Sequence, residues 1–278
     1  MSTVAMQPSV RFDRKRIRAN ALGRGLLGGL TAILTWEICS RAPQLFGFSV
    51  PYIGVIPAPS KVLVEWSILL KEPSYWRSWY QSFFRVFAGF GVAFLLGVPL
   101  GLALARSKII FGALFPVFEV LRPIPPIAWV PVSIIFWPTQ EMSIAFVIFL
   151  GAFYTMTLST MNGAREIDPA LIQSAVSMGA SRWSLYRNVI LPATLPSVTT
   201  GAAVGMGITW EVVVAAEMIS GGQSDRAGGG LGRLMWNAYV TGNYNAIVVA
   251  MISIGIAGYF SSALVRLLGR QLAPWAAR

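Results

Sequence analysis

The side chains with chemical capacity in this chain are a few charged residues inside otherwise apolar segments. Four acids and one arginine fall in such segments: Glu37, Glu119, Arg122, Glu211 and Glu217. A charge at the centre of a membrane helix costs about 2.5–3.5 kcal/mol on insertion scales, so each of these residues needs a partner or a polar cavity. The chemistry open to them is attraction of an ion or relay of a proton.

Covalent chemistry has few candidate residues. The chain contains no histidine, which removes the commonest general base and metal ligand, and its one cysteine, Cys39, allows neither an internal disulfide nor a cysteine-based metal cluster. No apolar segment contains a lysine or an aspartate, so no Ser-Lys or Asp-Asp pair lies within a span. The Gly-x-x-x-x-Gly-Lys-Ser/Thr motif of ATP-binding proteins is also missing. We therefore expect no catalytic residue, metal or cofactor in this chain.

Arg122 is followed by a break in its apolar segment. The break contains three prolines, Pro123, Pro125 and Pro126. Prolines prevent a regular helix, and irregular backbone at membrane depth is tolerated only inside protein or against a cavity. Glu119 lies three residues before Arg122, so the two side chains share a helical face. Two interpretations of Arg122 stay open: an internal ion pair that eases insertion and fixes the break, or an arginine that attracts an anion in the translocation path. Residues 122 to Trp129 either line that path or its gate, or form a loop that merely turns the chain back.

Two acids near the C-terminal third complete the candidates for this path. Glu211 follows Trp210 inside an apolar segment and should face the protein interior or a water-filled cavity. A proton relay at Glu211 would lack a histidine or a second acid at helical spacing. Glu217 lies near the outer end of the same segment, where it either holds an outer gate or lies at the membrane surface.

The elements that position these residues are membrane spans. Of 278 residues, 55% are hydrophobic and 12% are charged, whereas soluble proteins carry about a quarter charged residues. A bilayer takes about 20 apolar residues to cross. We predict an all-α polytopic membrane protein with about six spans, near 22–42, 81–105, 109–128, 142–162, 192–218 and 243–267. The glycines of the second span look like helix-packing positions: Gly89, Gly91, Gly97 and Gly101.

The net charge of +11 reflects topology rather than a nucleic-acid partner, because the basic residues gather at the ends of apolar runs. The side that holds the N-terminal basic cluster carries about twice as many lysines and arginines as the other side. The positive-inside rule then places both termini in the cytoplasm. Residues 1–21 are predicted to be a basic cytoplasmic segment, and residues 22–278 a single transmembrane domain.

The most organised polar stretch lies between the fourth and fifth spans, from Gln173 to Pro192. Gly179 would let the chain turn or pack closely there, and Pro192 would begin the next span where its missing N–H costs little. Trp183 and Tyr186 are three apart and share a face. The stretch is either an interfacial helix anchored by aromatics or a docking surface for a cytoplasmic protein.

This stretch resembles the EAA loop of binding-protein-dependent ABC importer permeases, whose pattern is Glu-Ala-Ala, three residues, Gly, nine residues, then Ile-x-Leu-Pro. Gln173-Ser174-Ala175 stands in for Glu-Ala-Ala, so a carboxylate available to the ATPase is lost. The resemblance implies an ATPase-coupling segment at about 165–192, with these contact residues: Gln173, Ser174, Ala175, Gly179, Ala180, Arg182, Leu191 and Pro192.

Four further motifs look like the nitrate, sulfonate, taurine and bicarbonate branch of that family: Ile56–Ser60, Leu121–Pro131, Ala215–Met218 and Gly230–Trp236. The resemblance implies a type I importer permease fold in a bacterial inner membrane, and a homodimer. It also implies two cytoplasmic ATPase subunits that bind ATP and Mg²⁺, and an extracytoplasmic binding protein that delivers a small anion.

Two other classes remain as alternatives. An ion-coupled secondary transporter usually contains an internal repeat with two broken helices in corresponding positions, and the sequence shows one break. An intramembrane enzyme would need the nucleophile and base that the spans lack.

Overall fold

The structure is a computed structural model that describes residues 14–46, 56–220 and 229–277, and every element within those ranges is a helix. The chain divides into two compact units, Met1–Glu65 and Trp66–Arg278.

The first unit consists mainly of α1 (Arg14–Phe46), which contains the first predicted span. Glu37, the acid inside that span, has close partners. The Arg41 guanidinium lies 2.5 Å from its carboxylate, and Ser60 donates its backbone N–H and its hydroxyl to it at 3.0 and 2.8 Å. These contacts satisfy the charge locally. Helix α2 (Pro59–Leu69) begins in this unit.

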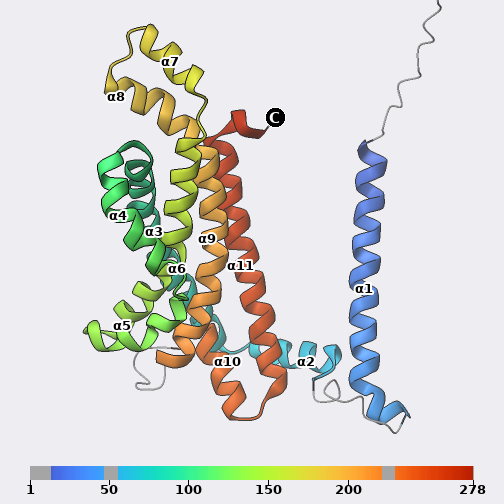
Figure 1. Cartoon of the computed structure of the whole chain (residues 1–278). Coiled ribbons are helices and arrows are strands. Elements are labelled where there is room, and N and C mark those ends of the chain that lie inside the picture. Colours follow the sequence, from blue (N-terminus) through green and yellow to red (C-terminus); the bar gives the residue numbers. More distant parts are fainter. Residues whose placement is uncertain (1–13, 47–55, 221–228, 278) are drawn as a thin grey trace, which may run out of the picture. The chain divides into compact units, whose positions relative to one another are not determined.

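The second unit is a bundle of long helices with shorter helices at both ends. Its elements are α3 (Pro73–Arg106), α4 (Lys108–Leu121), η1 (Pro126–Trp129), α5 (Val130–Phe136), α6 (Gln140–Arg165), α7 (Pro169–Ser177), α8 (Arg182–Leu185), η2 (Tyr186–Ile190), α9 (Leu191–Ser220), α10 (Leu231–Val240), α11 (Tyr244–Leu272) and η3 (Pro274–Ala277). Helix α9 packs between α6 and α11 (Figure 1). Helices α7 and α8 lie at the end of the bundle where α11 ends, and α5 and α10 lie at the opposite end (Figure 1).

Within the described residues, four helical segments are long and apolar enough to cross a membrane: α3, α6, Arg182–Ile219 and α11. The pair Lys108–Leu121 and Pro126–Phe136, bent by 90°, makes a fifth if it is one span. The predicted break after Leu121 is confirmed, and the predicted third span 109–128 is therefore not one straight helix. Helix α1 is not among these segments, so the count of six spans stays a prediction.

Small residues let the central helices approach closely. A Cβ on Gly89 or Gly101 would lie within 3 Å of α6 atoms, and one on Gly97 would lie 3.2 Å from the Thr157 hydroxyl. The predicted packing role of these three glycines is confirmed, whereas Gly91 faces open space. Close backbone approach is typical of membrane helices, because lipid offers no hydrophobic drive for helices to associate.

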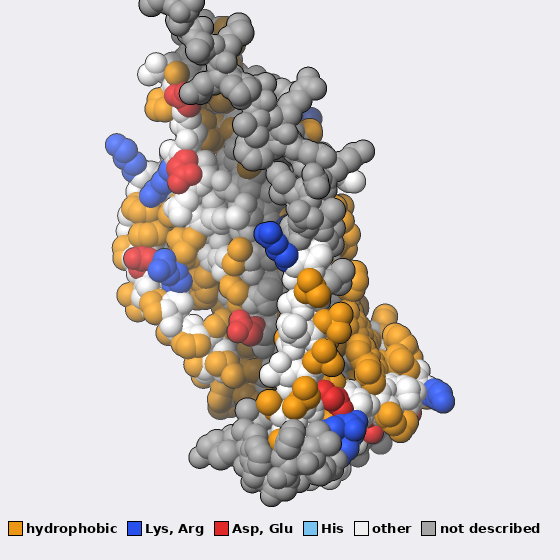
Figure 2. Space-filling view, turned by 90° about the vertical axis from the view of Figure 1, so that its right-hand side faces the viewer, with side chains coloured by type: hydrophobic (Ala, Val, Ile, Leu, Met, Phe, Trp, Pro, Cys, Tyr) orange, Lys and Arg blue, Asp and Glu red, His pale blue; other side chains and the backbone are white. Residues whose placement is uncertain are grey.

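The outer faces of the helices carry large hydrophobic side chains. Leu95 is 70% exposed and Phe260 64%, and both lie on segments long enough to span a bilayer. Figure 2 shows hydrophobic side chains over much of the described surface, with few charged side chains between them. An exposed apolar surface of this extent is expected of a protein that is solvated by lipid.

Candidate functional sites

Helix α7 is bounded at both ends by local hydrogen bonds. The Asp168 side chain accepts from the Ala170 N–H at 2.8 Å at the N-terminus. At the C-terminus the N–H of Gly179 bonds to the Val176 carbonyl at 2.9 Å, and the N–H of Ala180 bonds to Ala175 at 3.1 Å. This is a Schellman motif, which requires a left-handed residue, and Gly179 has a φ of +83°. No atom lies within 4 Å of a Cβ built on Gly179, so the glycine is needed for the turn and not for close packing.

Helix α8 continues without interruption into the next span. The Ser181 side chain caps its N-terminus by accepting from the Ser184 N–H at 3.2 Å. The π-helical turn η2 follows, in which the Leu191 N–H bonds to the Tyr186 carbonyl, five residues back. This wide turn accommodates Pro192, whose ring would clash with a carbonyl in a regular helix.

Pro192 lies in the first turn of α9, close to where the sequence predicts the start of a span, but the helical run already begins at Arg182. Because α8, η2 and α9 form one run to Ile219, α8 is a direct continuation of a helix that is long and apolar enough to cross a membrane.

The α7–α8 segment exposes a set of large apolar side chains that we call the coupling surface: Leu171, Val176, Met178 and Trp183. Met178 is 82% exposed and Trp183 is 68% exposed, with the Trp183 ring stacked on Tyr186 at 5.9 Å between centroids. Large apolar side chains exposed on short helices at one end of the bundle suit contact with a protein partner or with the membrane surface, the two interpretations that the sequence left open.

The eight predicted coupling residues take different positions in this segment. Exposed positions are occupied by Gln173, Ser174, Gly179 and Arg182. Ala175 is buried in a cluster with Leu102 and Ile167, and partly buried positions are taken by Ala180, Leu191 and Pro192. The first group is available to a partner, whereas the second group holds the segment on the bundle.

A groove of about 460 Å³ runs along α6 and α9 and includes two residues of the predicted path, Arg122 and Pro126. Its polar lining comprises Tyr154, Thr155, Ser159, Asn162 and Thr200. Arg122 pairs with Glu119 at 3.2 Å, as their spacing predicts, and both side chains are about half exposed. An exposed pair of this kind contributes about 0–1 kcal/mol. We call this cavity the α6–α9 groove.

The other predicted path residues do not line this groove. Pro123 and Pro125 are exposed in the turn between α4 and η1, and Trp129 is partly buried. Glu211 is exposed on α9. The assignment of these residues to a path stays a prediction.

Glu217 lies in a buried network at the opposite end of the bundle from α7 and α8. The Arg85 guanidinium lies 2.9 Å from its carboxylate, and both side chains are almost fully buried. The Ser82 hydroxyl donates to Glu217 at 2.8 Å and accepts from the Leu231 N–H at 2.8 Å, and the Gly232 N–H donates to Glu217 at 2.9 Å. Glu217 and Ser82 thus satisfy N–H groups at the start of α10, where a negative charge is also favoured.

This network joins four helices. Arg85 on α3 also donates to Glu141 on α6, at 2.8 and 2.5 Å, and to the Gly229 carbonyl at 3.3 Å. We call Ser82, Arg85, Glu141 and Glu217 the outer network. Glu217 is 1% exposed and enclosed by protein, and its role at an outer gate or at the membrane surface stays a prediction. The sequence analysis did not single out Ser82, Arg85 or Glu141; the signal that could have pointed to Arg85 is that an acid buried among helices requires a cation nearby.

Comparison with known proteins identifies the family. Residues 97–278 match the family described as binding-protein-dependent transport system inner membrane component. The chain belongs to this family.

Several named relatives of this permease are transport proteins. This chain is 31% identical to the nitrate import permease protein NrtB of Synechocystis sp. over 228 residues. The alignment covers 79% of this chain and 81% of the relative. The chain is 30% identical over 225 residues to the taurine transport system permease protein TauC of Escherichia coli, covering 79% and 80%. A putative ABC transporter permease protein of Methanocaldococcus jannaschii is 37% identical over 174 residues, which are 63% of each chain. The chain therefore spans slightly less than two thirds of this last relative.

Solved structures show the same fold. A structure of the inward-facing MetNI methionine ABC transporter aligns with a TM-score of 0.59 at 21% identity, covering 75% of this chain and 100% of the other. A bacterial ABC transporter involved in the import of the acidic polysaccharide alginate aligns at 0.58 and 14% identity, covering 92% and 98%. The permease therefore has the helical fold of ABC importer permeases, with α7–α8 as its helical segment between spans.

Proposed function

We propose that this permease forms the membrane channel of a homodimeric ABC importer that moves a small anion inward by alternating access. Two cytoplasmic ATPase subunits, which bind ATP and Mg²⁺, drive the motion, and an extracytoplasmic binding protein delivers the anion. The observation that carries this proposal is the unbroken helical run Arg182–Ile219. One end of the run bears Trp183 of the coupling surface, and its middle part supplies Thr200 and Val204 to the α6–α9 groove. A displacement of α8 by an ATPase therefore moves a wall of the groove.

The coupling surface is suited to a protein partner. Its exposed tryptophan and aliphatic side chains resemble the few large residues that dominate binding energy in protein interfaces. The Schellman turn and the two N-caps fix the shape of α7 and α8 before the partner binds. The ATPase is the partner that the family implies at this position.

A small anion fits the α6–α9 groove. Arg122 lines the groove together with hydroxyl groups and an amide; no acidic side chain is among the lining residues, and the guanidinium of Arg122 pairs with Glu119 at 3.2 Å. Guanidinium and hydroxyl groups together bind oxyanions by charge-assisted hydrogen bonds. The names of two relatives, which import nitrate and taurine, support an anion such as nitrate, bicarbonate or a sulfonate.

The distribution of basic residues supports a cytoplasmic position for α7 and α8 and for both termini in a bacterial inner membrane. Arg106, Arg165, Arg182 and Arg270 are exposed near the α7–α8 end, whereas at the opposite end Lys71 and Arg77 are exposed and Arg85 is buried in the outer network. Glu211, exposed on a spanning helix, supports a second copy of the chain, because an acid at that depth must face protein or a water-filled cavity.

Reconstitution tests this proposal. The tagged permease is purified from native membranes, co-purifying proteins are identified by mass spectrometry, and ATP-dependent uptake of nitrate, taurine and bicarbonate is measured in vesicles. We expect a Walker-motif ATPase in equal amount and uptake of one of the anions. Gly179→Trp should abolish substrate-stimulated ATP hydrolysis, whereas Gly112→Trp, which alters an exposed glycine with open space around it, should not. Normal stimulation in Gly179→Trp, or uptake by the isolated chain on an ion gradient, would contradict the proposal.

A further inference from the structure

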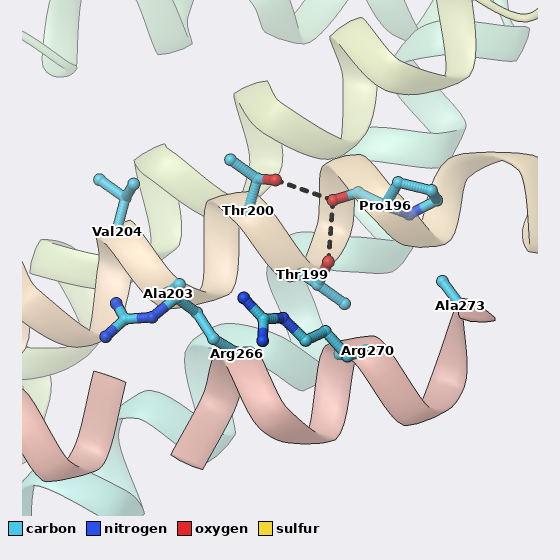
Figure 3. A pocket seen from close by; sticks show the side chains of 9 residues that line it. Pro196, Thr199, Thr200, Ala203, Val204, Arg266, Arg270 and Ala273 are labelled. Carbon is cyan, nitrogen blue, oxygen red and sulfur yellow. Dashed lines mark hydrogen bonds between the residues drawn. The ribbon is translucent and has the colours of Figure 1, made fainter. Parts of the chain in front are cut away.

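A second groove, of about 740 Å³, lies between α9 and the C-terminal part of α11. Arg266 and Arg270 line it from α11, and Thr199 and Thr200 line it from α9. Figure 3 shows both guanidinium groups turned toward α9. We call this cavity the α9–α11 groove. It lies toward the end of the bundle that carries α7 and α8, since α11 ends there (Figure 1).

The charge in this groove has no counterpart among its lining residues. Arg266 and Arg270 are four apart on one face of α11, and like charges at this spacing repel. No acidic side chain lines the groove, and the four ion pairs found in the described ranges involve other arginines. Topology explains why arginines occur at this end of a span. Their four-residue spacing puts both arginines on the face of α11 that lies toward α9, and an anion bound in the groove would offset the repulsion between them.

The opposite wall offers hydroxyl groups. Thr199 and Thr200 both donate to the Pro196 carbonyl at 2.9 Å. A hydroxyl hydrogen can rotate toward a ligand, so the two threonines can add donors to those of the guanidinium groups. Two planar guanidinium groups suit an oxyanion, because each can donate two parallel hydrogen bonds.

The two grooves share part of α9. Thr200 and Val204 line both the α6–α9 groove and the α9–α11 groove. Arg122 lies in the groove on one side of Thr200 and Val204, and Arg266 and Arg270 lie in the groove on the other side. An anion attracted by Arg122 therefore has a second cationic site close by.

We propose that the α9–α11 groove is a second binding site for a small oxyanion, held by Arg266 and Arg270 with the hydroxyls of Thr199 and Thr200. The role of the site, holding the anion before its release to the cytoplasm, rests on the proposed import function. The binding itself does not, and it is measured on the permease alone.

Thermal unfolding of the purified full-length permease tests the site. The probe is sodium nitrate, titrated in detergent at constant ionic strength with sodium chloride, since a ligand that binds the folded state raises its unfolding temperature. The titration is made in an Arg122→Gln background, so that the α6–α9 groove does not contribute. Arg266→Gln and Arg270→Gln should each raise the apparent nitrate dissociation constant about tenfold, since each removes a charge-assisted contact. Arg106→Gln, at an exposed position that lines neither groove, should leave the constant unchanged.

Two further measurements separate the contribution of charge from that of the guanidinium geometry, and a free anion from a lipid phosphate. Arg266→Lys/Arg270→Lys retains both charges and should bind nitrate more weakly than the background protein but more tightly than the glutamine variants. If the glutamine variants and Arg106→Gln titrate alike, the site is wrong. A parallel series in nanodiscs with and without phosphatidylglycerol identifies the source of the anion. Arginine-dependent stabilisation by phosphatidylglycerol alone, with no response to nitrate, would make this a lipid phosphate site and overturn the proposal.

Discussion

The two ends of the bundle differ in which side chains they bury: the α7–α8 end exposes large apolar side chains, and the α5–α10 end buries charged ones. At the α7–α8 end, local caps satisfy the backbone and leave Met178 and Trp183 exposed. At the α5–α10 end, Arg85 and Glu217 are buried and bound to each other, and hydrogen bonds from Ser82 complete the pairing with α10. The first end is rigid within itself and open to a partner, whereas the second is closed by contacts between helices that are distant in sequence.

This difference matches the requirements of the proposed mechanism. A segment that receives force from another protein must keep its own shape and offer a surface. The opposite end must keep four helices in register while the groove between α6 and α9 changes, and a buried network of charged and hydroxyl groups fixes one arrangement. The comparison predicts that substitutions at the outer network act on stability, whereas substitutions on the coupling surface act on partner binding.

The largest effect on stability is expected for Glu217→Ala. The substitution removes the buried partner of Arg85, the acceptor of the Gly232 N–H at the start of α10 and the acceptor of the Ser82 hydroxyl. Breaking a buried ion pair costs about 3–5 kcal/mol, and unfolding of the purified permease in denaturant measures it. The control is Glu119→Ala, whose pair with Arg122 is half exposed and contributes about 0–1 kcal/mol. Equal losses in the two variants would mean that the outer network does not stabilise the bundle.

Ser82→Ala should have an intermediate effect of about 1–3 kcal/mol, because it leaves the buried Leu231 N–H without its acceptor. Ser78→Ala, one turn earlier on α3, is the matched control, since the Ser78 hydroxyl bonds to a carbonyl of its own helix. The same denaturation measurement compares them. A larger loss in Ser78→Ala than in Ser82→Ala would refute the assigned role of Ser82.

Gly179→Ala and Gly255→Ala should change the unfolding free energy in opposite directions. Alanine at the φ of +83° found at Gly179 costs about 1–2 kcal/mol. Gly255 lies within α11 with open space at its Cβ position, so alanine there should stabilise the helix by about 0.5–1 kcal/mol. The pair is compared by thermal unfolding, and changes of the same sign would show that Gly179 is not held in the left-handed turn.

The smallest effect on stability is expected for Trp183→Ala, below about 0.5 kcal/mol, because the side chain is 68% exposed. The affinity of the Trp183→Ala permease for the ATPase should nevertheless fall at least about tenfold, because the substitution removes an exposed aromatic anchor. This affinity is measured as binding of the purified ATPase to surface-immobilised permease. Trp236→Ala, on α10 at the opposite end, should retain normal binding.

Local features were predictable from the sequence and long-range ones were not. The position of the α7–α8 segment, the turn at Gly179 and the break after Leu121 follow from residue types within a few positions, because caps, glycines and prolines act locally. The sequence left both a turn and close packing open at Gly179, and the backbone φ together with the open space at its Cβ position decides for the turn. The unbroken run from Arg182 was missed, because its first turns are polar and Pro192 suggested a boundary.

The outer network and the α9–α11 groove depend on tertiary packing. Ser82 and Glu217 are 135 residues apart in the chain, so no local pattern connects them. Arg266 and Arg270 have the spacing of topological charges, and their direction is set by the close contact of Gly269 with Thr199, where a Cβ would lie 2.6 Å from the threonine.

Site-specific crosslinking tests the central claim most directly. Single cysteines replace Met178, 82% exposed on the coupling surface, or Tyr239, 61% exposed on α10, in a Cys39→Ser background. Each is labelled with a photocrosslinker in native membranes, and the products are identified by mass spectrometry. The account predicts a product with a Walker-motif ATPase from position 178 and none from position 239. An ATPase product from position 239, or no protein product from position 178, would contradict it.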